Sequence, residues 1–332
     1  MKAMVLAAGL GLRMRPLTLL RAKPVLPVLN RPLLHWTLEL LRRHGVTDVV
    51  INLHHLPTTV RRSMGDGRTL GVRVSYSFER KILGTAGGPR KVRRFFGDEP
   101  FLLVNGDVLF DFDLSDLVRR HAASGARATL ALKPHRQVGL YGGIVTGPGG
   151  FIRALAGLPR PVAGRRLLFT GVHVLDPDLL DRLPPGPSDT VRDLYAPLVA
   201  EGQRLLGVRV SGAWYDFGSP SLYLASQLSM MSSGFRGAGV ARLVHPDARI
   251  HPRARVTRSV VGAGTVVGEG AIVSGSVLWE GAQVARGARV SGSIVATGGR
   301  VAEGEVVERA VVLPVRKGAK SRMALAETGK KP

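Results

Sequence analysis

Residues 3–18 read AMVLAAGLGLRMRPLT, a short apolar run that passes directly into a glycine-rich and basic turn. Ala3 to Ala7 is typical of a buried first strand. Glycines directly after a strand let backbone N–H groups approach phosphate oxygens closely, and arginine or lysine beyond them can neutralise the remaining charge. The stretch therefore predicts an α/β fold with a site for a triphosphate at the carboxyl end of its first strand.

The same turn departs from two other phosphate-binding motifs. The dinucleotide fingerprint needs a third glycine at position 14, where this chain has Met14. The lysine-containing loop of P-loop NTPases is also absent from the sequence. Both departures weigh against an NAD-dependent oxidoreductase and a P-loop NTPase.

Length and composition indicate a globular protein of about two domains. The chain has 332 residues, of which 45% are hydrophobic, enough to bury well over half of its unfolded surface. It has no cysteine, so a disulfide framework and a thiolate metal site are excluded, and we expect a cytoplasmic protein. The sequence shows neither an export signal nor an apolar run long enough to span a membrane.

The formal net charge of +23 comes mainly from arginines spread along the chain. Such a surface can bind nucleic acid or attract small anions such as nucleotides and sugar phosphates. Aromatic residues make up only 5% of the chain, and neither an RNA-binding sheet motif nor a helix-turn-helix pattern is visible. Nucleic acid is therefore disfavoured as a partner.

Short apolar runs alternate with helical patterns from Met1 to about Met231, which predicts a largely parallel sheet covered by helices. Asn30 is a candidate cap for a helix whose apolar stripe runs from Leu33 to Leu41. Further strands are expected at 49–53, 72–76 and 101–104. The last of these ends at Asn105-Gly106-Asp107, where open parallel sheets usually place catalytic groups. Asp113 is expected to cap the helix that begins near Leu114.

The pattern changes after about Gly234, where aliphatic residues recur at steps of five or six. This hexapeptide repeat is typical of a β-helix whose flat faces stack aliphatic side chains inward. The expected inward residues are Ile250, Val256, Val261, Val266, Ile272, Leu278, Val284, Val290, Val295, Val301, Val306 and Val312. We therefore divide the chain into a catalytic domain (1–233), a β-helix (240–314) and a disordered basic tail (315–332).

Five ordered motifs resemble those of the sugar-phosphate nucleotidyltransferases. They are Gly9-x-Gly11-x-Arg13-x-x-Pro16-x-Thr18 with Lys23-Pro24, Leu83–Gly88, Asn105-Gly106-Asp107, Tyr141-Gly142 and Trp214–Pro220. With the repeat, the chain resembles bacterial mannose-1-phosphate guanylyltransferases that carry a left-handed β-helix. The resemblance implies a Rossmann-like domain that converts a nucleoside triphosphate and a sugar 1-phosphate into a nucleotide sugar and pyrophosphate.

The resemblance also implies roles for individual residues. Arg13, Lys23, Asp107 and Asp216 would be catalytic, and the two aspartates would hold Mg²⁺, a hard cation that prefers oxygen ligands. The expected nucleotide-binding residues are Leu6, Ala8, Gly9, Gly11, Arg13, Lys23, Thr85 and Gly87. The expected sugar-binding residues are Asn105, Tyr141, Gly142 and Gly171.

One departure from the family leaves the substrates open. Many relatives carry a Glu-Lys-Pro motif that holds the sugar hydroxyls and the sugar phosphate, whereas this chain has Gly157-Leu158-Pro159. Arg160, Arg165 or Arg166 are candidate replacements for the missing cation. Mannose 1-phosphate with GTP is the first choice, and uridylyl or thymidylyl transfer to an N-acetylmuramate or glucose type of sugar is the alternative.

The sequence disfavours two other functions, a noncatalytic regulatory subunit and a β-helix acyltransferase. A regulatory subunit would be expected to lose one of the four catalytic residues, all of which are present. A β-helix acyltransferase commonly needs a histidine between coils, but His245 and His251 precede most of the repeat. The β-helix is expected instead to join copies of the chain into a homo-oligomer.

Overall fold

The computed structural model describes residues 1–332 except 137, 141, 234, 236–242, 316–320 and 326–332. The chain forms two compact units. The first unit contains Met1–Leu10 and Leu34–Trp214, and the second contains Gly11–Leu33 and Tyr215–Pro332. The glycine-rich segment thus groups with the C-terminal repeat, a division that differs from the sequential one drawn from the sequence.

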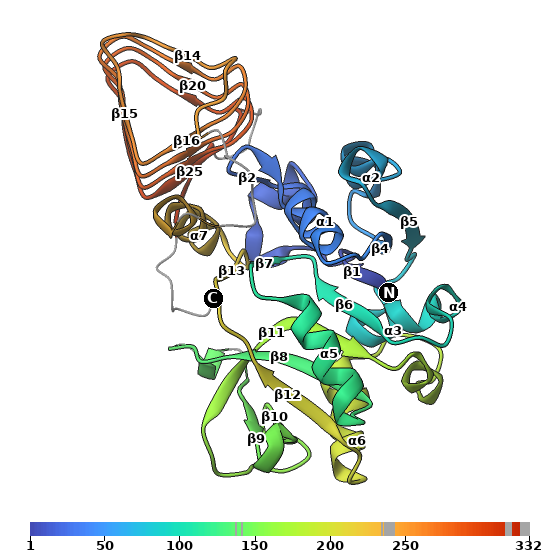
Figure 1. Cartoon of the computed structure of the whole chain (residues 1–332). Helices are drawn as coiled ribbons and strands as arrows, with labels where there is room; N and C mark the ends of the chain where they lie inside the picture. The colour runs from blue at the N-terminus through green and yellow to red at the C-terminus, as the bar shows by residue number, and fades with distance from the viewer. Residues whose placement is uncertain (137, 141, 234, 236–242, 316–320, 326–332) are drawn as a thin grey trace. The chain divides into compact units, whose positions relative to one another are not determined.

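A nine-stranded mixed sheet forms the centre of the first unit (Figure 1). Its main path runs β10-β9-β11-β6-β1-β4-β5, and β8 pairs with both β11 and β12. The strands are β1 (Lys2–Leu6), β4 (Asp48–Leu53), β5 (Arg73–Phe78), β6 (Phe101–Asn105), β8 (Ala128–Lys133), β9 (Ile144–Thr146), β10 (Ile152–Leu155), β11 (Arg166–Leu175) and β12 (Leu205–Arg209). Strands β5, β4, β1 and β6 are mutually parallel, so their carboxyl ends meet at one edge.

The other elements of the chain are mostly short. The helices are α1 (Leu33–Arg43), α2 (Pro57–Met64), α3 (Gly84–Lys91), α4 (Arg93–Phe96), α5 (Leu114–Ser124), α6 (Ala196–Ala200) and α7 (Pro220–Ser233). The remaining strands before the repeat are β2 (Pro27–Val28), β3 (Arg31–Pro32), β7 (Val108–Phe110) and β13 (Trp214–Asp216). The prediction for Asp113 is confirmed, because its Oδ1 accepts from the N–H groups of Ser115 (2.8 Å) and Asp116 (3.2 Å) at the start of α5. Among the described residues, none of these helices is long and apolar enough to cross a membrane.

The predicted helix cap at Asn30 is wrong. Asn30 lies in the two-residue turn between the antiparallel strands β2 and β3, where Leu29 (φ 48°) and Asn30 (φ 64°) both have positive φ. Tight hairpin turns need this conformation, and asparagine adopts it more readily than most residues. The Asn30 amide donates to the carbonyl oxygen of Val261 (2.9 Å) in the repeat, and α1 begins at Leu33.

The C-terminal repeat is a β-helix of parallel strands in three stacked ladders, drawn orange to red in Figure 1. The first ladder is β14 (Arg249–Ile250), β17 (Val266–Val267), β20 (Gln283–Val284) and β23 (Arg300–Val301). The second is β15 (Arg255–Thr257), β18 (Ile272–Ser274), β21 (Arg289–Ser291) and β24 (Val306–Glu308). The third is β16 (Val260–Val261), β19 (Val277–Leu278), β22 (Ile294–Val295) and β25 (Ala310–Val312), extended by the antiparallel strand β26 (Arg322–Ala324).

Strand β26 lies inside the segment predicted as a disordered tail. It pairs Val311 with Met323, so residues 322–324 have regular structure and cover the last coil. The other residues of that predicted tail lie outside the described residues, apart from Val315, Ser321 and Leu325.

The interior of the β-helix corrects three of the predicted inward residues. Val266 (40% exposed), Val306 (58%) and the half-buried Ile272 face outward, while the residue that follows each of them is buried. Adjacent residues of a strand point to opposite faces, and a pair of neighbouring aliphatics does not reveal which one faces inward. The buried partners are Val267, Val273 and Val307.

A ladder of serines repeats the same contact from coil to coil. The Ser259 hydroxyl accepts from the Ser276 N–H, and the Ser276 hydroxyl accepts from the Ser293 N–H, both at 3.1 Å. The Ser293 hydroxyl accepts in turn from the Ala310 N–H at 3.1 Å. Each step spans 17 residues, so one coil of the β-helix contains 17 residues.

Within the second unit, polar contacts join the segment 11–33 to α7 and the β-helix. The Arg21 guanidinium forms an ion pair with Glu280, donates to the Thr297 hydroxyl (3.1 Å) and lies over the ring of Trp279. Trp279 is buried, and its Nε1 donates to the hydroxyl of Tyr223 on α7 at 2.9 Å. These contacts account for the grouping of two segments that lie far apart in the sequence.

Candidate active site

The glycine-rich turn directly follows the first strand of the sheet. Strand β1 is buried between β4 and β6, and the half-buried Leu6 is its last residue. Ala8 is 4% exposed, whereas Gly9 is exposed and a Cβ added there would meet nothing within 4 Å. The backbone at Gly9 is therefore open to a ligand.

The end of β6 lies against the end of β1. Leu6 is in register with Asn105, and the Gly106 N–H donates to the Leu6 carbonyl oxygen at 2.9 Å. A Cβ at position 106 would approach that oxygen to 2.6 Å, closer than a side chain tolerates, so only glycine fits. The half-buried Asp107 follows directly, so the glycine-rich turn and Asp107 leave from neighbouring strand ends.

Two residues predicted to bind sugar lie in contact. Gly171 in β11 has φ +79°, and a Cβ there would lie 2.6 Å from Asn105 Nδ2, so the Asn105 amide packs over the glycine. Gly142 (φ +67°) packs against Ala156, where an added Cβ would lie 2.7 Å from the Ala156 Cβ. Tyr141 lies outside the described residues.

Thr85 is engaged by another loop of the protein. Its hydroxyl donates to Asp189 Oδ2 (3.0 Å) and accepts from the Thr190 N–H (2.8 Å). The Ala86 N–H donates to the carbonyl oxygen of Ser188 (2.9 Å), and a Cβ at Gly87 would lie 2.3 Å from the carbonyl oxygen of Gly186. The loop 186–190, which sequence reasoning missed, therefore holds the loop that carries Thr85 and Gly87.

The second unit contains Gly11, Arg13, Lys23 and Asp216. Gly11 has φ +63°, its carbonyl oxygen accepts from the Thr18 hydroxyl (2.8 Å), and an added Cβ would lie 2.7 Å from the Thr18 Cγ2. Arg13 is exposed in a 3₁₀ turn (Leu12–Met14) that follows Gly11, and the half-buried Lys23 begins another (Lys23–Val25). The Thr18 contact thus fixes the turn that presents Arg13.

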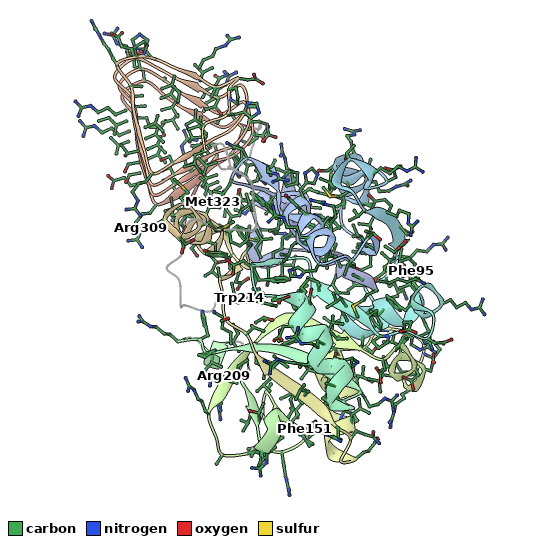
Figure 2. All side chains as sticks on the ribbon, viewed as in Figure 1. Phe95, Phe151, Arg209, Trp214, Arg309 and Met323 are labelled. Carbon is green, nitrogen blue, oxygen red and sulfur yellow. The ribbon has the colours of Figure 1, made fainter. Side chains whose placement is uncertain are left out.

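Asp216 is 9% exposed at the end of β13. Its backbone carbonyl oxygen accepts from the Ser226 hydroxyl of α7 at 2.9 Å, and a Cβ at Gly218 would lie 3.0 Å from its Oδ1. Glycine at 218 therefore leaves the carboxylate uncrowded on that side. Trp214, labelled in Figure 2, belongs to the first unit, where its Nε1 donates to the Thr170 carbonyl oxygen at 2.9 Å.

A buried histidine lies two residues after Gly171. His173 is 1% exposed, and its Nδ1 lies 2.5 Å from the hydroxyl of the fully buried Tyr195. Burial lowers the pKa of His173 from 6.5 to about 3 and raises the pKa of Tyr195. His173 is therefore neutral at physiological pH, and its ring packs edge-on against Phe169 and Tyr195.

Two buried polar residues near the glycine-rich turn and the loop 83–87 were not identified from the sequence. Asn52 (2% exposed) interrupts the apolar run of β4, and Glu79 (1% exposed) follows β5 directly. A carboxylate or amide is seldom fully buried without partners, so a polar residue inside a predicted buried strand is the signal that could have found Asn52. His54 also contacts this region, because its Nδ1 lies 2.8 Å from the Glu79 carbonyl oxygen.

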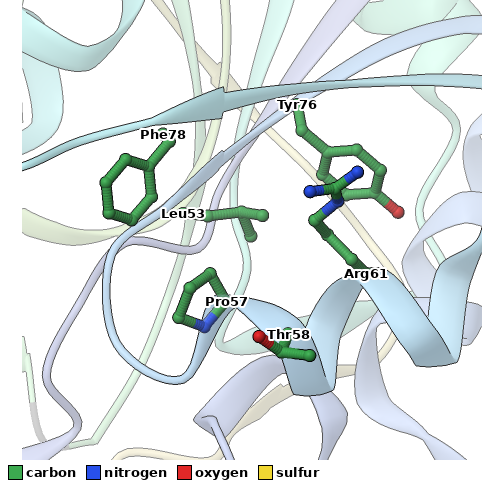
Figure 3. Close-up of a pocket in the computed structure, with 6 residues that line it drawn as sticks. All are labelled: Leu53, Pro57, Thr58, Arg61, Tyr76 and Phe78. Carbon is green, nitrogen blue, oxygen red and sulfur yellow. The ribbon is translucent and has the colours of Figure 1, made fainter.

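A pocket in the part of the chain that the structure describes is formed by residues of β4, α2 and β5. It has a volume of about 470 Å³ and is lined by Leu53, Pro57, Thr58, Arg61, Tyr76 and Phe78 (Figure 3). The Arg61 guanidinium lies over the Tyr76 ring, 5.8 Å from its centroid. None of the residues predicted to bind substrate lines this pocket.

The segment that departs from the sugar-binding motif is exposed. Leu158 is 37% exposed, and the candidate cations Arg160, Arg165 and Arg166 are exposed as well. Nitrogen-tipped side chains also project from both units in Figure 2, in keeping with a charge that is spread rather than gathered. The described residues contain no group of three or more histidine, aspartate or glutamate side chains that could hold a metal by themselves.

Comparison with known proteins adds two family matches. Residues 2–232 match the family model described as nucleotidyl transferase, and residues 240–326 match the model of the GMPPB C-terminal domain. These ranges include all five motifs and the β-helix.

Three relatives illustrate the similarity. A UTP--glucose-1-phosphate uridylyltransferase from Synechocystis is 31% identical over 84% of this chain and 83% of its own length. A mannose-1-phosphate guanyltransferase beta-B from Xenopus laevis is 30% identical over 76% of this chain and 68% of its own length. A mannose-1-phosphate guanylyltransferase from Mycobacterium tuberculosis is 30% identical over 84% and 79%.

Proposed function

This chain belongs to the nucleotidyl transferase family, and we propose from that premise that it joins GTP to mannose 1-phosphate, releasing GDP-mannose and pyrophosphate. An oxygen of the sugar phosphate attacks the α-phosphorus of the triphosphate in line, the bond to the β-phosphate oxygen breaks, and pyrophosphate leaves. No covalent enzyme intermediate is needed.

The observation that carries this proposal is the junction of β1 and β6. The Gly106 contact with Leu6 brings the glycine-rich turn and Asp107 to neighbouring strand ends. A triphosphate lying on the open backbone of Gly9 would then lie beside the strand end that carries Asp107, whose carboxylate would help to hold a divalent cation.

The basic residues supply charge that the backbone cannot. We assign Arg13 to the β- and γ-phosphates, where a planar guanidinium neutralises the leaving pyrophosphate, and Lys23 to the α-phosphate. Leu6, Ala8, Gly9, Gly11, Thr85 and Gly87 would line the nucleotide, with Thr85 contributing backbone groups because its hydroxyl is engaged by Asp189. Asn105, Gly142 and Gly171 would contact the sugar.

The donor set fits a divalent metal ion of the Mg²⁺ type. Asp107 and Asp216 offer carboxylate oxygens, which hard cations prefer, and neither carboxylate has a thiol or imidazole competitor in its motif. When bound, Mg²⁺ would neutralise negative charge on the reacting phosphates. The two aspartates would hold the cation, and Arg13 and Lys23 would neutralise the remaining phosphate charge.

Support for mannose and guanine comes from the guanylyltransferases among the relatives and from the GMPPB C-terminal domain match. The uridylyltransferase relative favours the alternative of uridylyl transfer to a glucose type of sugar. The missing Glu-Lys pair at Gly157-Leu158 means that the sugar is held by other groups, for which Arg160, Arg165 and Arg166 are the candidates.

The test is pyrophosphate release with Mg²⁺ across a matrix of GTP, UTP, dTTP, ATP and CTP against mannose, glucose, N-acetylglucosamine and N-acetylmuramate 1-phosphates. Turnover with GTP and mannose 1-phosphate alone is the expected result. Turnover with another pair would show that the protein uses those substrates instead. No pyrophosphate release with any pair would contradict a catalytic role.

We further propose that the protein works in the cytoplasm as a homo-oligomer joined through its β-helix. Repeat architectures present extended faces to partners, and the outward Val266 and Val306 are apolar positions on such faces. Light scattering of the full chain should give a multiple of 35.5 kDa. A mass of one chain would refute the assembly.

A further inference from the structure

A continuous chain of hydrogen bonds crosses the sheet beneath the two nucleotide loops. The Ala7 N–H donates to Asn52 Oδ1 at 2.7 Å, and Asn52 Nδ2 donates to Glu79 Oε1 at 2.8 Å. The Leu83 N–H donates to the other carboxylate oxygen, Oε2, at 2.8 Å. The bonds therefore connect the glycine-rich turn, which begins at Ala7, with the loop that begins at Leu83.

The order of donors and acceptors in this series of hydrogen bonds is fixed at both of its ends. Backbone N–H groups of Ala7 and Leu83 can only donate, so the two side chains between them must together present acceptors at both outer positions. An asparagine offers one acceptor and one donor, and an ionised carboxylate offers two acceptors. Asn52 followed by Glu79 satisfies every position, and no other assignment of these two side chains does so.

The two side chains in this series of hydrogen bonds are buried from water and tightly packed. Asn52 is 2% exposed and Glu79 is 1% exposed. A Cβ added at Gly88 would lie 2.9 Å from both Asn52 Nδ2 and Glu79 Oε1, so the first helical turns of α3 pack directly onto the bond between them. A mismatched donor or acceptor here would stay unpaired, because no solvent can replace its partner.

Both ends of the hydrogen-bonded series are followed in sequence by residues that the proposed function assigns to the nucleotide. Ala8 and Gly9 follow Ala7, and Thr85 and Gly87 follow Leu83. The Glu79 carbonyl oxygen also contacts His54 Nδ1, and the Glu79 N–H donates to the Leu53 carbonyl oxygen at 2.8 Å, which ties the glutamate to the end of β4. These two side chains thus link the two loops through hydrogen bonds.

We propose that Asn52 and Glu79 are positioning residues that hold the glycine-rich turn and the 83–87 loop at the separation required to bind the nucleoside triphosphate, an inference that rests on the proposed function. Neither side chain touches substrate, since both are buried and both carboxylate oxygens of Glu79 have partners inside the protein. They act through the backbone of Ala7 and Leu83.

The donor pattern allows a test by loss and rescue. Glu79→Gln places an amide donor against a donor, and Asn52→Asp places two carboxylates against each other. Each single variant should raise KM for the triphosphate about tenfold or more, the scale of one lost bond to a buried charged group. KM for the sugar 1-phosphate should change little. A merely structural role would lower the active fraction, and therefore kcat, at an unchanged KM.

The double variant Asn52→Asp with Glu79→Gln restores the pattern. The aspartate then accepts from Ala7 and from the glutamine amide, and the glutamine oxygen accepts from Leu83. The net charge equals that of the wild type, and KM for the triphosphate should return to within about threefold of it. Additive losses in the double variant would overturn the inference.

Asp48→Asn is the matched control. Asp48 pairs with Arg73 through two bonds of 2.7 Å across the same two strands, at their opposite ends, so the change is also a carboxylate to an amide. Its KM for the triphosphate should stay unchanged. A wild type without turnover in the substrate matrix would overturn the proposed function and the inference with it, whereas an active wild type whose single variants keep their KM would overturn the inference alone.

Discussion

Asp107 is the residue whose proposed role depends most directly on charge. It leaves the end of β6 half-buried, next to the turn that would hold the triphosphate. If its carboxylate contributes about 4 kcal/mol to transition-state stabilisation through a cation, Asp107→Asn should lower kcat about a thousandfold. The measurement is pyrophosphate release at saturating substrates.

Asp113→Asn is the comparison for that variant. Asp113 lies only six positions further on, and asparagine preserves its capping bonds to Ser115 and Asp116. Activity close to that of the wild type is expected. Equal losses in the two variants would show that Asp107 matters only for the local fold.

His173 makes stability depend on pH. Its pKa is about 3 in the folded protein and 6.5 when unperturbed. Between pH 3 and pH 6.5 the unfolded chain therefore binds a proton at this residue, whereas the folded protein does not. The free energy of unfolding should therefore fall as pH drops below 6.5, with this residue contributing up to about 1.4 kcal/mol per pH unit. Denaturant titrations at several pH values measure the slope.

Replacing the histidine isolates its share of that slope. In His173→Gln an amide oxygen can still accept from the Tyr195 hydroxyl, but no titrating group remains at this position. The variant should lose stability less steeply than the wild type on acidification. Parallel curves for the two proteins would contradict a buried, neutral His173.

At the scale of elements, adjacent valines in β17 provide a test of which face of the β-helix is the core. Val267 is 1% exposed and Val266 is 40% exposed. Val267→Ala leaves a cavity among stacked aliphatics and should lower the free energy of unfolding by roughly 2 kcal/mol. Val266→Ala should change it by less than about 0.5 kcal/mol. Chemical unfolding of both variants measures the difference, and a larger loss for Val266 would reverse the assignment.

Elements that depend on local sequence were predictable. The expected strands at 3–7 and 101–104 agree within one residue with β1 (Lys2–Leu6) and β6 (Phe101–Asn105), because continuous apolar runs bounded by polar or glycine residues leave little choice. The cap at Asp113 rests on bonds to its own helix and was confirmed for the same reason.

Features that depend on distant partners were not predictable. Asn30 bonds to Val261, which lies 231 positions away, and Thr85 bonds to Asp189, which lies 104 positions away. A glycine-rich motif indicates where backbone can approach a ligand, but it carries no information on the loop that supports it. The site motifs could therefore be identified from the sequence. The role of Asn52 and Glu79 could not, because it depends on their contacts in the folded protein.

At the scale of the whole molecule, the net charge of +23 should govern how fast anionic substrates are captured. Both proposed substrates are anions, so the protein's field raises their local concentration, and salt screens that field. Raising the salt concentration from about 50 to about 300 mM should lower kcat/KM several-fold while kcat changes little. Initial rates at both salt concentrations check this, and a flat kcat/KM would show that the charge plays no part.

The serine ladder of the β-helix implies that the length of this protein can change only in steps of one coil. Each coil offers the next one the same hydroxyl acceptor after 17 residues, and β26 closes the last coil. An internal duplication or loss of 17 residues would leave every remaining coil facing an equivalent neighbour, whereas an insertion within a strand that is not a multiple of 17 residues would shift the valines out of register. Descendants of this chain can therefore grow or shrink by whole coils and keep the first unit and the closing strand unchanged.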